Sequence, residues 1–417
     1  MILDPGTPLR VGLATGKDVL PVARIAMAGG VAQLEWSPEI RERDWAIDPL
    51  YPPVAGLVAA PGRAFYGLHP FLADSLPDGW GMRLMKRRLA ARDIRIEKLD
   101  GLDRLALVGR RGRGALVYEP DALPEERSEA LDLDALAAEA DQIWLGADEG
   151  ALADTLARLG GGSGGARPKV HIAYLADGRL CVGDSPDETL ALAEQWIVKF
   201  RSPEDAVDIG PVEQAYAELA RNAGIDMSAS RLVPAAKGPG YFSTQRFDRP
   251  APGQRLHVVS LAGALRTDWN TPTIGYHQFF QATRAITRHQ GDVEQAYRRM
   301  VFNILSSNRD DHAGQHAYLM DNAGQWRLSP AYDLTFSHGP RGEHYLDVDG
   351  EGRRPTRAHA TTLAQKHGIA LPLANKIIDE VRASLSSWTD IAEETGVTAS
   401  AKEIRTRLTE IDLDFRP

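Results

Sequence analysis

The chain has 417 residues, which is longer than most single domains, so we expect two or three domains with separate hydrophobic cores. Its 43% hydrophobic and 25% charged residues are typical of a globular protein, and its one cysteine, Cys181, excludes an intramolecular disulfide and is interpreted as a small core residue. A formal net charge of −9 argues against a general nucleic-acid binder. Neither a signal peptide nor an apolar run of about 18 residues is apparent, so we expect a cytoplasmic protein.

The N-terminal part alternates short apolar and polar runs broken by glycine and proline, as in VGLAT and GVAQLEW, over residues 1 to about 70. This pattern predicts a small antiparallel sheet or barrel. Helical spacing begins near Pro77 and continues through GWGMRLMKRRLAARDI, and a second helical pattern covers about 131 to 159. The first region is therefore predicted to be rich in strands, with helices after it.

The middle of the chain returns to strand patterns over residues 168 to 200. PKVHIAYLADGRLCV predicts a hairpin around Asp177 and Gly178, and EQWIVKF predicts a short apolar strand. Pro211 opens a predicted helix, VEQAYAELARNAG, which ends at Gly224. Further strands are expected in SRLVPAAKG and GYFSTQRFDR.

The C-terminal half, after about residue 260, is predicted to be mainly helical. The clearest case is VEQAYRRMVFNIL at 293–305, whose apolar residues follow the spacing of a buried helical stripe. This helix is expected to end near Asn308. The order along the chain is thus a β-rich start, a mixed middle and a helical end.

A glycine run, GGGSGGA, occupies residues 160–166 and leads into a strand that carries Lys169. A flexible linker is one interpretation. The run is not a dinucleotide fingerprint, because a helix precedes it and a strand follows, and no Lys-Ser or Lys-Thr closes it as a Walker A loop would. The alternative is a loop whose bare N–H groups approach phosphate oxygens closely, as in a kinase-like phosphate lid.

Lys199 lies in the apolar strand Trp196–Phe200, where a charge is unfavourable without a partner. An edge strand with the lysine facing solvent is one explanation. Kinases instead use a helix glutamate to hold a strand lysine against the phosphates, and Glu213 on the following helix is the candidate here.

The most specific pattern is NILSSNRDDHAGQHAYLM followed by WRLSPAYDLTFS. Asp310 follows a helix, and Asp333 follows a hairpin about 23 positions later. Phosphoryl transfer needs two such carboxylates, because one accepts the hydroxyl proton and the other holds magnesium on the phosphates. Gln315 occupies the position, five residues after the base, at which protein kinases place a second metal ligand.

Two other interpretations of this segment stay open. Asp310 to His312 could form an Asx-rich turn that caps the hairpin. A metal-hydrolase site built from Asp310, Asp311, His312 and His316 is the second, because these residue types suit zinc or manganese. The ordered combination of glycine loop, strand lysine, helix glutamate and two aspartates favours the kinase interpretation.

These motifs resemble those of the HipA family of Ser/Thr kinase toxins over most of the chain. FYGLHPFLADSLPDGWG resembles the family's N-terminal segment, GGSGGARPK its nucleotide loop and WIVKF its ATP-binding lysine strand. TQRFDR resembles its hinge, and NRDDHAGQHAYL and SPAYDL resemble its catalytic and metal-binding loops. The GGARPK sequence is most similar to the long stand-alone HipH-like branch.

The resemblance implies an α+β, two-lobed kinase-like fold with an additional β-rich N-terminal subdomain and a mainly helical C-terminal lobe. The expected domains are 1–110, 111–249 with the glycine loop and lysine, and 250–417 with the catalytic loop. The implied cofactors are ATP and Mg²⁺, with Asp310 as catalytic base and Asp333 and Gln315 as metal ligands. The implied nucleotide-binding residues are Gly162, Ser163, Gly164, Gly165, Ala166, Arg167, Lys169, Lys199, Gln245, Arg246, Phe247, His312, Gln315, Tyr332 and Asp333.

The resemblance also implies regulation and partners. Ser163 is the candidate for autophosphorylation, which in the family ejects the loop and inactivates the kinase. The implied partners are a protein substrate with a Ser or Thr acceptor, for which aminoacyl-tRNA synthetases are the family precedent, and a helix-turn-helix antitoxin. Two departures from the family pattern are Gln315 in place of asparagine and Gln245 in place of the hinge glutamate.

Two other functions remain open at this point. The chain could be a kinase-shaped protein that is catalytically weak and acts as the partner of a DNA-binding antitoxin. It could also be a small-molecule kinase, because the fold resembles lipid and sugar kinases as well.

Overall fold

The structure is a computed structural model of the chain, and it describes residues 2–4, 6–16, 18–43, 45–122, 131–146, 155–156, 159, 164–175, 178–183, 193–268 and 271–416. The chain divides into two compact units. The first comprises Met1–Glu204, Ser243–Val259 and Leu319–Gln325. The second comprises Asp205–Phe242, Ser260–Tyr318 and Trp326–Pro417.

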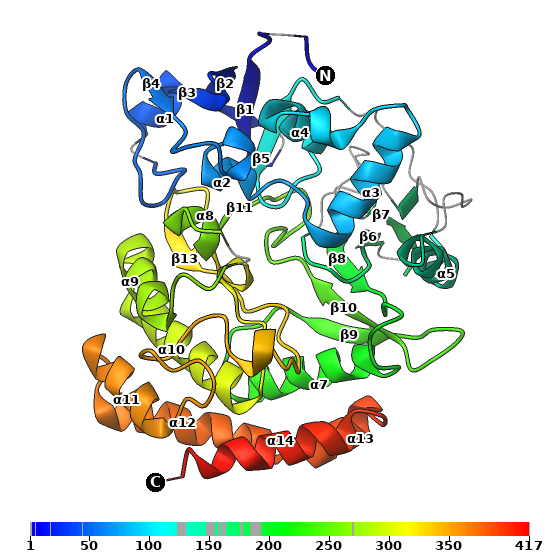
Figure 1. Cartoon of the computed structure of the whole chain (residues 1–417), viewed down its shortest axis with the longest axis vertical. Coiled ribbons are helices and arrows are strands. Elements are labelled where there is room, and N and C mark those ends of the chain that lie inside the picture. The colour runs from blue at the N-terminus through cyan, green and yellow to red at the C-terminus, as the bar shows by residue number, and fades with distance from the viewer. Residues whose placement is uncertain are drawn as a thin grey trace. The chain divides into compact units, whose positions relative to one another are not determined.

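The first unit begins with a five-stranded antiparallel sheet of order β4-β3-β2-β1-β5 (Figure 1). Alternate residues of β1 form the core face of the sheet, since Leu9, Val11 and Leu13 are buried. Gly29 and Gly30 both have positive φ and form the tight β2–β3 turn. The sheet predicted for residues 1 to about 70 is confirmed, with one added strand. Its strands are β1 (Leu9–Ala14), β2 (Val19–Ala28), β3 (Val31–Trp36), β4 (Leu57–Ala59) and β5 (Leu116–Glu119).

Along the chain, most helices described in the first unit lie between strands of this sheet, and one follows its last strand. Trp80 and Leu84 of α3 are fully buried, as its amphipathic spacing predicts. Two short helices, α1 and α2, begin with proline and were not expected from periodicity. The helices are α1 (Pro38–Glu42), α2 (Pro70–Ala73), α3 (Gly79–Ala90), α4 (Gly101–Val108) and α5 (Leu133–Trp144).

A second sheet contains the predicted hairpin and the lysine strand. Here β6 pairs antiparallel with both β7 and β8, and β10 lies next to β8. Val170, Ile172 and Val198 are fully buried, and Cys181 of β7 is buried, which confirms its interpretation as a core residue. Among the strands of this sheet are β6 (Lys169–Tyr174), β7 (Leu180–Val182), β8 (Glu194–Lys199) and β10 (Tyr241–Gln245).

The second unit is mainly helical (Figure 1). The predicted helix at Pro211 begins two residues earlier, at Ile209. The chain also contains a small sheet of order β11-β12-β13, and its strands β11 (His257–Ser260) and β12 (Ala317–Met320) each have residues assigned to both units. The other elements of the second unit are α7 (Ile209–Asn222), β9 (Ser230–Val233), α8 (Leu261–Leu265), α9 (Tyr276–Thr287), α10 (Gln290–Leu305), β13 (Trp326–Leu328), α11 (Arg357–Lys366), α12 (Leu371–Ser386), α13 (Trp388–Thr395) and α14 (Ala401–Leu413).

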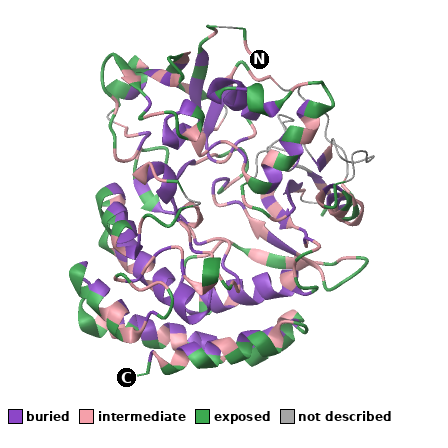
Figure 2. Cartoon of the chain, viewed as in Figure 1, coloured by how far each residue is buried: buried purple, intermediate pink, exposed green. Residues whose placement is uncertain are grey.

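Helix α10 lies at the centre of the helical core. It packs against α9 and α12, while α7 packs against α12 and α13. Its predicted stripe is confirmed, because Val293, Tyr297 and Met300 are fully buried. Figure 2 shows the same contrast, with α10 mostly buried and α14 largely exposed. The helix ends at Leu305, three residues before the predicted Asn308.

The element content confirms the expected α+β class, with a β-rich N-terminal region and a helical C-terminal part. The boundaries 1–110, 111–249 and 250–417 stay a prediction. In the part of the chain that the structure describes, no helix combines the length and apolarity needed to cross a membrane.

Candidate functional site

The end of the glycine run is held close to the start of β6. The Lys169 ammonium donates to the Gly164 carbonyl at 2.5 Å. Gly165 has φ of +86°, and a Cβ placed there would lie 2.6 Å from the Lys169 nitrogen. The positive φ favours glycine at this position, while the Lys169 side chain is long enough to move aside. Gly162 and Ser163 lie outside the described residues.

The two predicted phosphate-binding lysines are neighbours across a strand pair. Lys169 of β6 stands directly opposite Lys199 of β8 in the antiparallel register. Opposed residues of such a pair place their side chains on the same face, about 5 Å apart at Cβ, and like charges there disfavour one another. The strand register thus places two positive charges close to the glycine backbone. A bound polyanion stabilises such an arrangement. The sequence predicted both residues but not their pairing.

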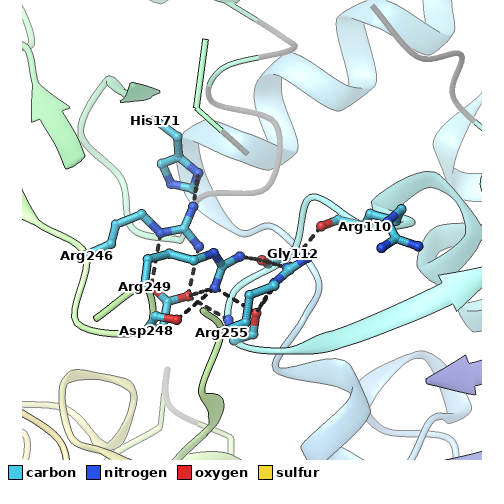
Figure 3. Close-up of polar contacts among 8 residues, drawn as sticks. Arg110, Gly112, His171, Arg246, Asp248, Arg249 and Arg255 are labelled. Carbon is cyan, nitrogen blue, oxygen red and sulfur yellow. Dashed lines mark hydrogen bonds and ion pairs between the residues drawn. The ribbon is translucent and has the colours of Figure 1, made fainter. Parts of the chain in front are cut away.

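The segment TQRFDR, which resembles the family hinge, begins at the end of β10 and carries a buried charge cluster (Figure 3). The Arg246 guanidinium donates to both carboxylate oxygens of Asp248, at 3.0 and 2.8 Å, and its Nη1 lies 3.3 Å from His171 Nδ1. The Arg246 backbone N–H donates to the Gln195 carbonyl at 2.9 Å. Arg246 of the predicted hinge therefore uses its N–H and its side chain within the first unit.

Asp248 connects this cluster to the turn before β5. It accepts from the Gly114 N–H at 2.8 Å and from Arg249 Nη1 at 2.8 Å, and Arg249 also donates to the Gly114 carbonyl at 2.9 Å. Burial would raise the pKa of Asp248, but Arg246 and Arg249 outweigh it and hold that pKa well below its ordinary value. This anchor was not predicted from the sequence, although the three charged residues in RFDR were a signal for it.

In the second unit, the two adjacent aspartates after α10 point in different directions. The Asp311 side chain is fully buried and accepts from Tyr276 Oη at 2.6 Å, His344 Nδ1 at 2.9 Å and Tyr345 N at 2.8 Å. Burial would raise the pKa of Asp311, yet His344 and these hydrogen bonds lower it. The Asp310 side chain, by contrast, is 48% exposed. Asp311 therefore fixes the loop and leaves Asp310 accessible.

His312 lies beside Asp310. Its Nε2 is 4.0 Å from Asp310 Oδ1, and its ring packs edge-on against Tyr345 with centroids 5.4 Å apart. The His312 Nδ1 accepts from the Gly314 N–H at 3.1 Å. Burial and the nearby Asp310 charge raise the pKa of Tyr345. The exposed carboxylate is thus bordered by two rings that the loop holds in place.

The later aspartate meets the predicted amide. Gln315 Nε2 donates to Asp333 Oδ2 at 2.8 Å, and Tyr332 Oη donates to the Gly314 carbonyl at 2.7 Å. Asp333 has φ of +57°, a left-handed conformation that aspartate tolerates better than most residues and that is found often at functional positions. Residues 18 positions apart therefore converge as the motif predicted.

The donor set at this position fits magnesium. Asp333 offers a carboxylate and Gln315 an amide oxygen, which are hard ligands, and magnesium commonly takes one or two protein oxygens together with substrate phosphates. The described ranges contain no group of three histidine, cysteine or acidic side chains arranged to hold a metal ion. The burial of two proposed ligands, Asp311 and His316, argues against the hydrolase alternative.

His316, a proposed ligand of that hydrolase site, is buried. Its ring stacks on Phe279 with centroids 4.2 Å apart. Burial and the nearby Arg299 lower the pKa of His316 to about 3, so the ring stays neutral. Asp311, the other proposed ligand, has its carboxylate oxygens engaged by Tyr276, His344 and Tyr345.

The predicted site residues thus form two groups, one in each unit. Gly164, Gly165, Lys169 and Lys199 gather in the first unit, with Ala166 and Arg167 between them along the chain. Asp310, His312, Gln315, Tyr332 and Asp333 gather in the second. Glu213 is buried on α7 in the second unit, whereas Lys199 belongs to the first, so their pairing stays a prediction.

Fold and site together define an α+β protein that presents a glycine loop with paired lysines and a separate loop of oxygen ligands. The family model of the HipA-like C-terminal domain matches residues 161–389, and that of the HipA N-terminal domain matches residues 20–119. The chain therefore belongs to the HipA family.

A solved structure agrees with this fold over nearly its whole length. HipA in the toxin–antitoxin complex of HipA, HipB and operator DNA from Shewanella oneidensis MR-1 aligns with a TM-score of 0.71 at 16% identity, covering 97% of this chain and 95% of that chain. The proinflammatory kinase CtkA of Helicobacter pylori gives a TM-score of 0.33 at 13% identity, over 52% of this chain and 92% of that chain. No curated protein is similar enough in sequence to match this chain.

Proposed function

We propose that this HipA-family protein is an ATP- and Mg²⁺-dependent protein kinase that phosphorylates Ser or Thr hydroxyls. The observation that carries the proposal is the contact of Gln315 with Asp333 at 2.8 Å, in the same loop region as the exposed Asp310. A carboxylate and an amide side by side, with a second carboxylate left accessible, match the metal-binding and base roles of phosphoryl transfer.

Each group has a distinct role in this reaction. The backbone at Gly164 and the ammonium groups of Lys169 and Lys199 bind and orient the phosphates. Asp310 accepts the proton of the acceptor hydroxyl, whose oxygen forms a bond to the γ-phosphorus as the bond to the bridging oxygen of ADP breaks. When bound at Asp333 and Gln315, magnesium supplies positive charge that offsets the charge on the phosphates.

The proposal extends to regulation and partners. The Shewanella HipA crystallised with HipB and operator DNA, so we propose that this chain is a toxin-like growth regulator whose partner is a DNA-binding antitoxin. Ser163 in the glycine run is the proposed autophosphorylation site. The protein substrate is proposed to present a Ser or Thr acceptor, with an aminoacyl-tRNA synthetase as one candidate to screen.

A single assay tests the kinase and its regulatory serine. The full chain is incubated with Mg²⁺ and γ-labelled ATP, alone and with cell lysate, and labelled products and phosphopeptides are then identified by mass spectrometry. We expect phosphate in the peptide that holds Ser163, and a loss of at least about 100-fold in Asp310→Ala, because a positioned general base contributes that much. Asp390→Ala is the control, since Asp390 is an exposed aspartate on α13.

The outcomes separate the proposed functions. Equal labelling of wild type and Asp310→Ala would contradict the role of the base. A wild-type protein that binds MgATP but transfers no phosphate to itself or to lysate proteins would favour the non-catalytic partner. Label found only in metabolites would favour a small-molecule kinase.

A further inference from the structure

The segment Pro77–Trp80, which opens α3, has no role in the site described so far. Asp78 occupies the N-cap position of α3. An aspartate there normally accepts a hydrogen bond from the second or third residue of its own helix. The Asp78 carboxylate makes no such bond and instead accepts the N–H of Gly165, at the end of the glycine run. This departure from the usual capping pattern indicates another use for the carboxylate.

Trp80 holds the same stretch through two further bonds. Its backbone N–H donates to the Gly165 carbonyl at 3.0 Å, and its indole Nε1 donates to the Lys169 carbonyl at 3.2 Å. The Trp80 side chain is fully buried, so it holds a fixed position. Gly165 is therefore bound on both its N–H and its carbonyl by residues that begin one helix.

Gly79 permits this close approach. A Cβ at Gly79 would lie 2.5 Å from the Gly165 carbonyl oxygen and 2.9 Å from the Ala166 Cα. Both neighbours are backbone atoms, which cannot turn aside as the end of a flexible side chain can. Each residue of the Asp-Gly-Trp sequence thus contributes to the contact with the glycine run. The aspartate and the tryptophan form hydrogen bonds, and the glycine leaves room for the approach.

We propose that Asp78 is a positioning residue that holds the end of the glycine run and Lys169 in the geometry that binds phosphate; this rests on the proposed nucleotide function. Glycine loses more conformational freedom on ordering than any other residue, so a loop of this composition binds weakly unless it is ordered beforehand. Asp78 acts through Gly165, whose neighbour Gly164 in turn accepts from the Lys169 ammonium. The Asp-Gly-Trp segment and the glycine loop therefore act together, although Asp78 and Gly165 are 87 positions apart in the sequence.

The decisive variant is Asp78→Ser. Serine is itself a good N-cap and preserves the start of α3, but its side chain is shorter than that of aspartate and loses the contact with Gly165. We expect the Kd for MgATP to rise about tenfold or more, as expected for loss of one charge-assisted hydrogen bond. Asp78→Asn retains an acceptor oxygen, so its Kd should stay within about threefold of wild type.

A second readout needs no nucleotide. Amide hydrogen exchange of the peptide that covers residues 164–169 should become faster in Asp78→Ser and remain near wild type in Asp78→Asn. The matched control is Asp100→Ser, because Asp100 caps α4 by accepting from the Asp103 N–H at 2.9 Å. This control should change neither the exchange of residues 164–169 nor the Kd.

The results distinguish this role from others. An unchanged Kd and unchanged exchange in Asp78→Ser would overturn the proposal. Tighter nucleotide binding would overturn it too, because it would mean that the carboxylate competes with phosphate for Gly165. If wild type fails to bind MgATP, the proposed kinase function fails, and exchange alone then decides whether Asp78 orders the loop.

Discussion

Gln315 illustrates how much a single residue determines at the proposed metal site. Its amide reaches Asp333 at 2.8 Å even though it is a methylene longer than the asparagine of the family pattern. The substitution seen in the sequence thus retains contact with the aspartate. The sequence pattern alone predicted both residues as metal ligands, because their spacing from Asp310 suits the metal site of a phosphoryl-transfer enzyme. It did not predict the left-handed backbone at Asp333, which depends on the surrounding loop.

The corresponding prediction concerns magnesium. Gln315→Ala removes one oxygen ligand, so we expect the Mg²⁺ concentration for half-maximal phosphoryl transfer to rise about tenfold, in keeping with the effect of changing a partner of a metal site. The measurement is a Mg²⁺ titration of autophosphorylation at fixed ATP. Gln325→Ala, in the turn between β12 and β13, is a control that should leave the titration curve in place. Superimposable curves for Gln315→Ala and wild type would exclude Gln315 as a ligand.

At the scale of secondary-structure elements, periodicity predicted the long helices and the strands but not what joins them. Helix α10 follows its apolar stripe, whereas α1 and α2 are too short to show one. The anchor of β10 was beyond prediction for a different reason. Asp248 bonds to Gly114, 134 positions away, and no local pattern specifies a partner at that distance.

This anchor predicts a stability effect. In Asp248→Asn the buried Arg246 and Arg249 lose their counter-charge, so we expect a loss of about 3–5 kcal/mol in the free energy of unfolding. Urea unfolding of the full chain measures it, with Glu119→Gln as the control, because the exposed Arg10–Glu119 pair is worth at most about 1 kcal/mol. A loss below 1 kcal/mol for Asp248→Asn would contradict the role of the cluster.

The lowered pKa of Asp248 also sets a pH dependence. A carboxyl whose pKa is lower in the folded than in the unfolded chain stabilises the fold above its ordinary pKa of about 4 and loses that contribution as pH falls further. The difference in stability between wild type and Asp248→Asn should therefore be constant from pH 7 to about 5 and shrink below about pH 4.

At the scale of the whole molecule, sequence order conceals which segments fold together. The first unit collects three stretches of chain, and two of them follow the start of the second unit. Composition and turn signals divide a sequence only into consecutive segments. They therefore cannot predict a unit that is assembled from separated stretches of chain. The two groups of site residues, one in each unit, were nonetheless predicted from their motifs.

Because the two groups of site residues lie in different units, the proposed function predicts that substitutions can impair nucleotide binding and phosphoryl transfer separately. Lys199→Met should raise the Kd for MgATP about tenfold, since a charged hydrogen bond to phosphate is lost. Asp310→Ala should keep that Kd within about threefold of wild type while phosphate transfer fails. Calorimetry with MgATP measures both, and Lys98→Met is the control because Lys98 is an exposed lysine of the first unit. Equal affinity in Lys199→Met and wild type would remove this lysine from the nucleotide site.

The return of residues 243–259 to the first unit constrains how the protein can be cut or recombined. A fragment that stops at Glu204 would lack Asp248 and Arg249, and so would leave both polar groups of Gly114 without the bonds described above. Chimaeras between relatives should therefore exchange residues 1–204, 243–259 and 319–325 as a set, and a single crossover point is the wrong design for this chain.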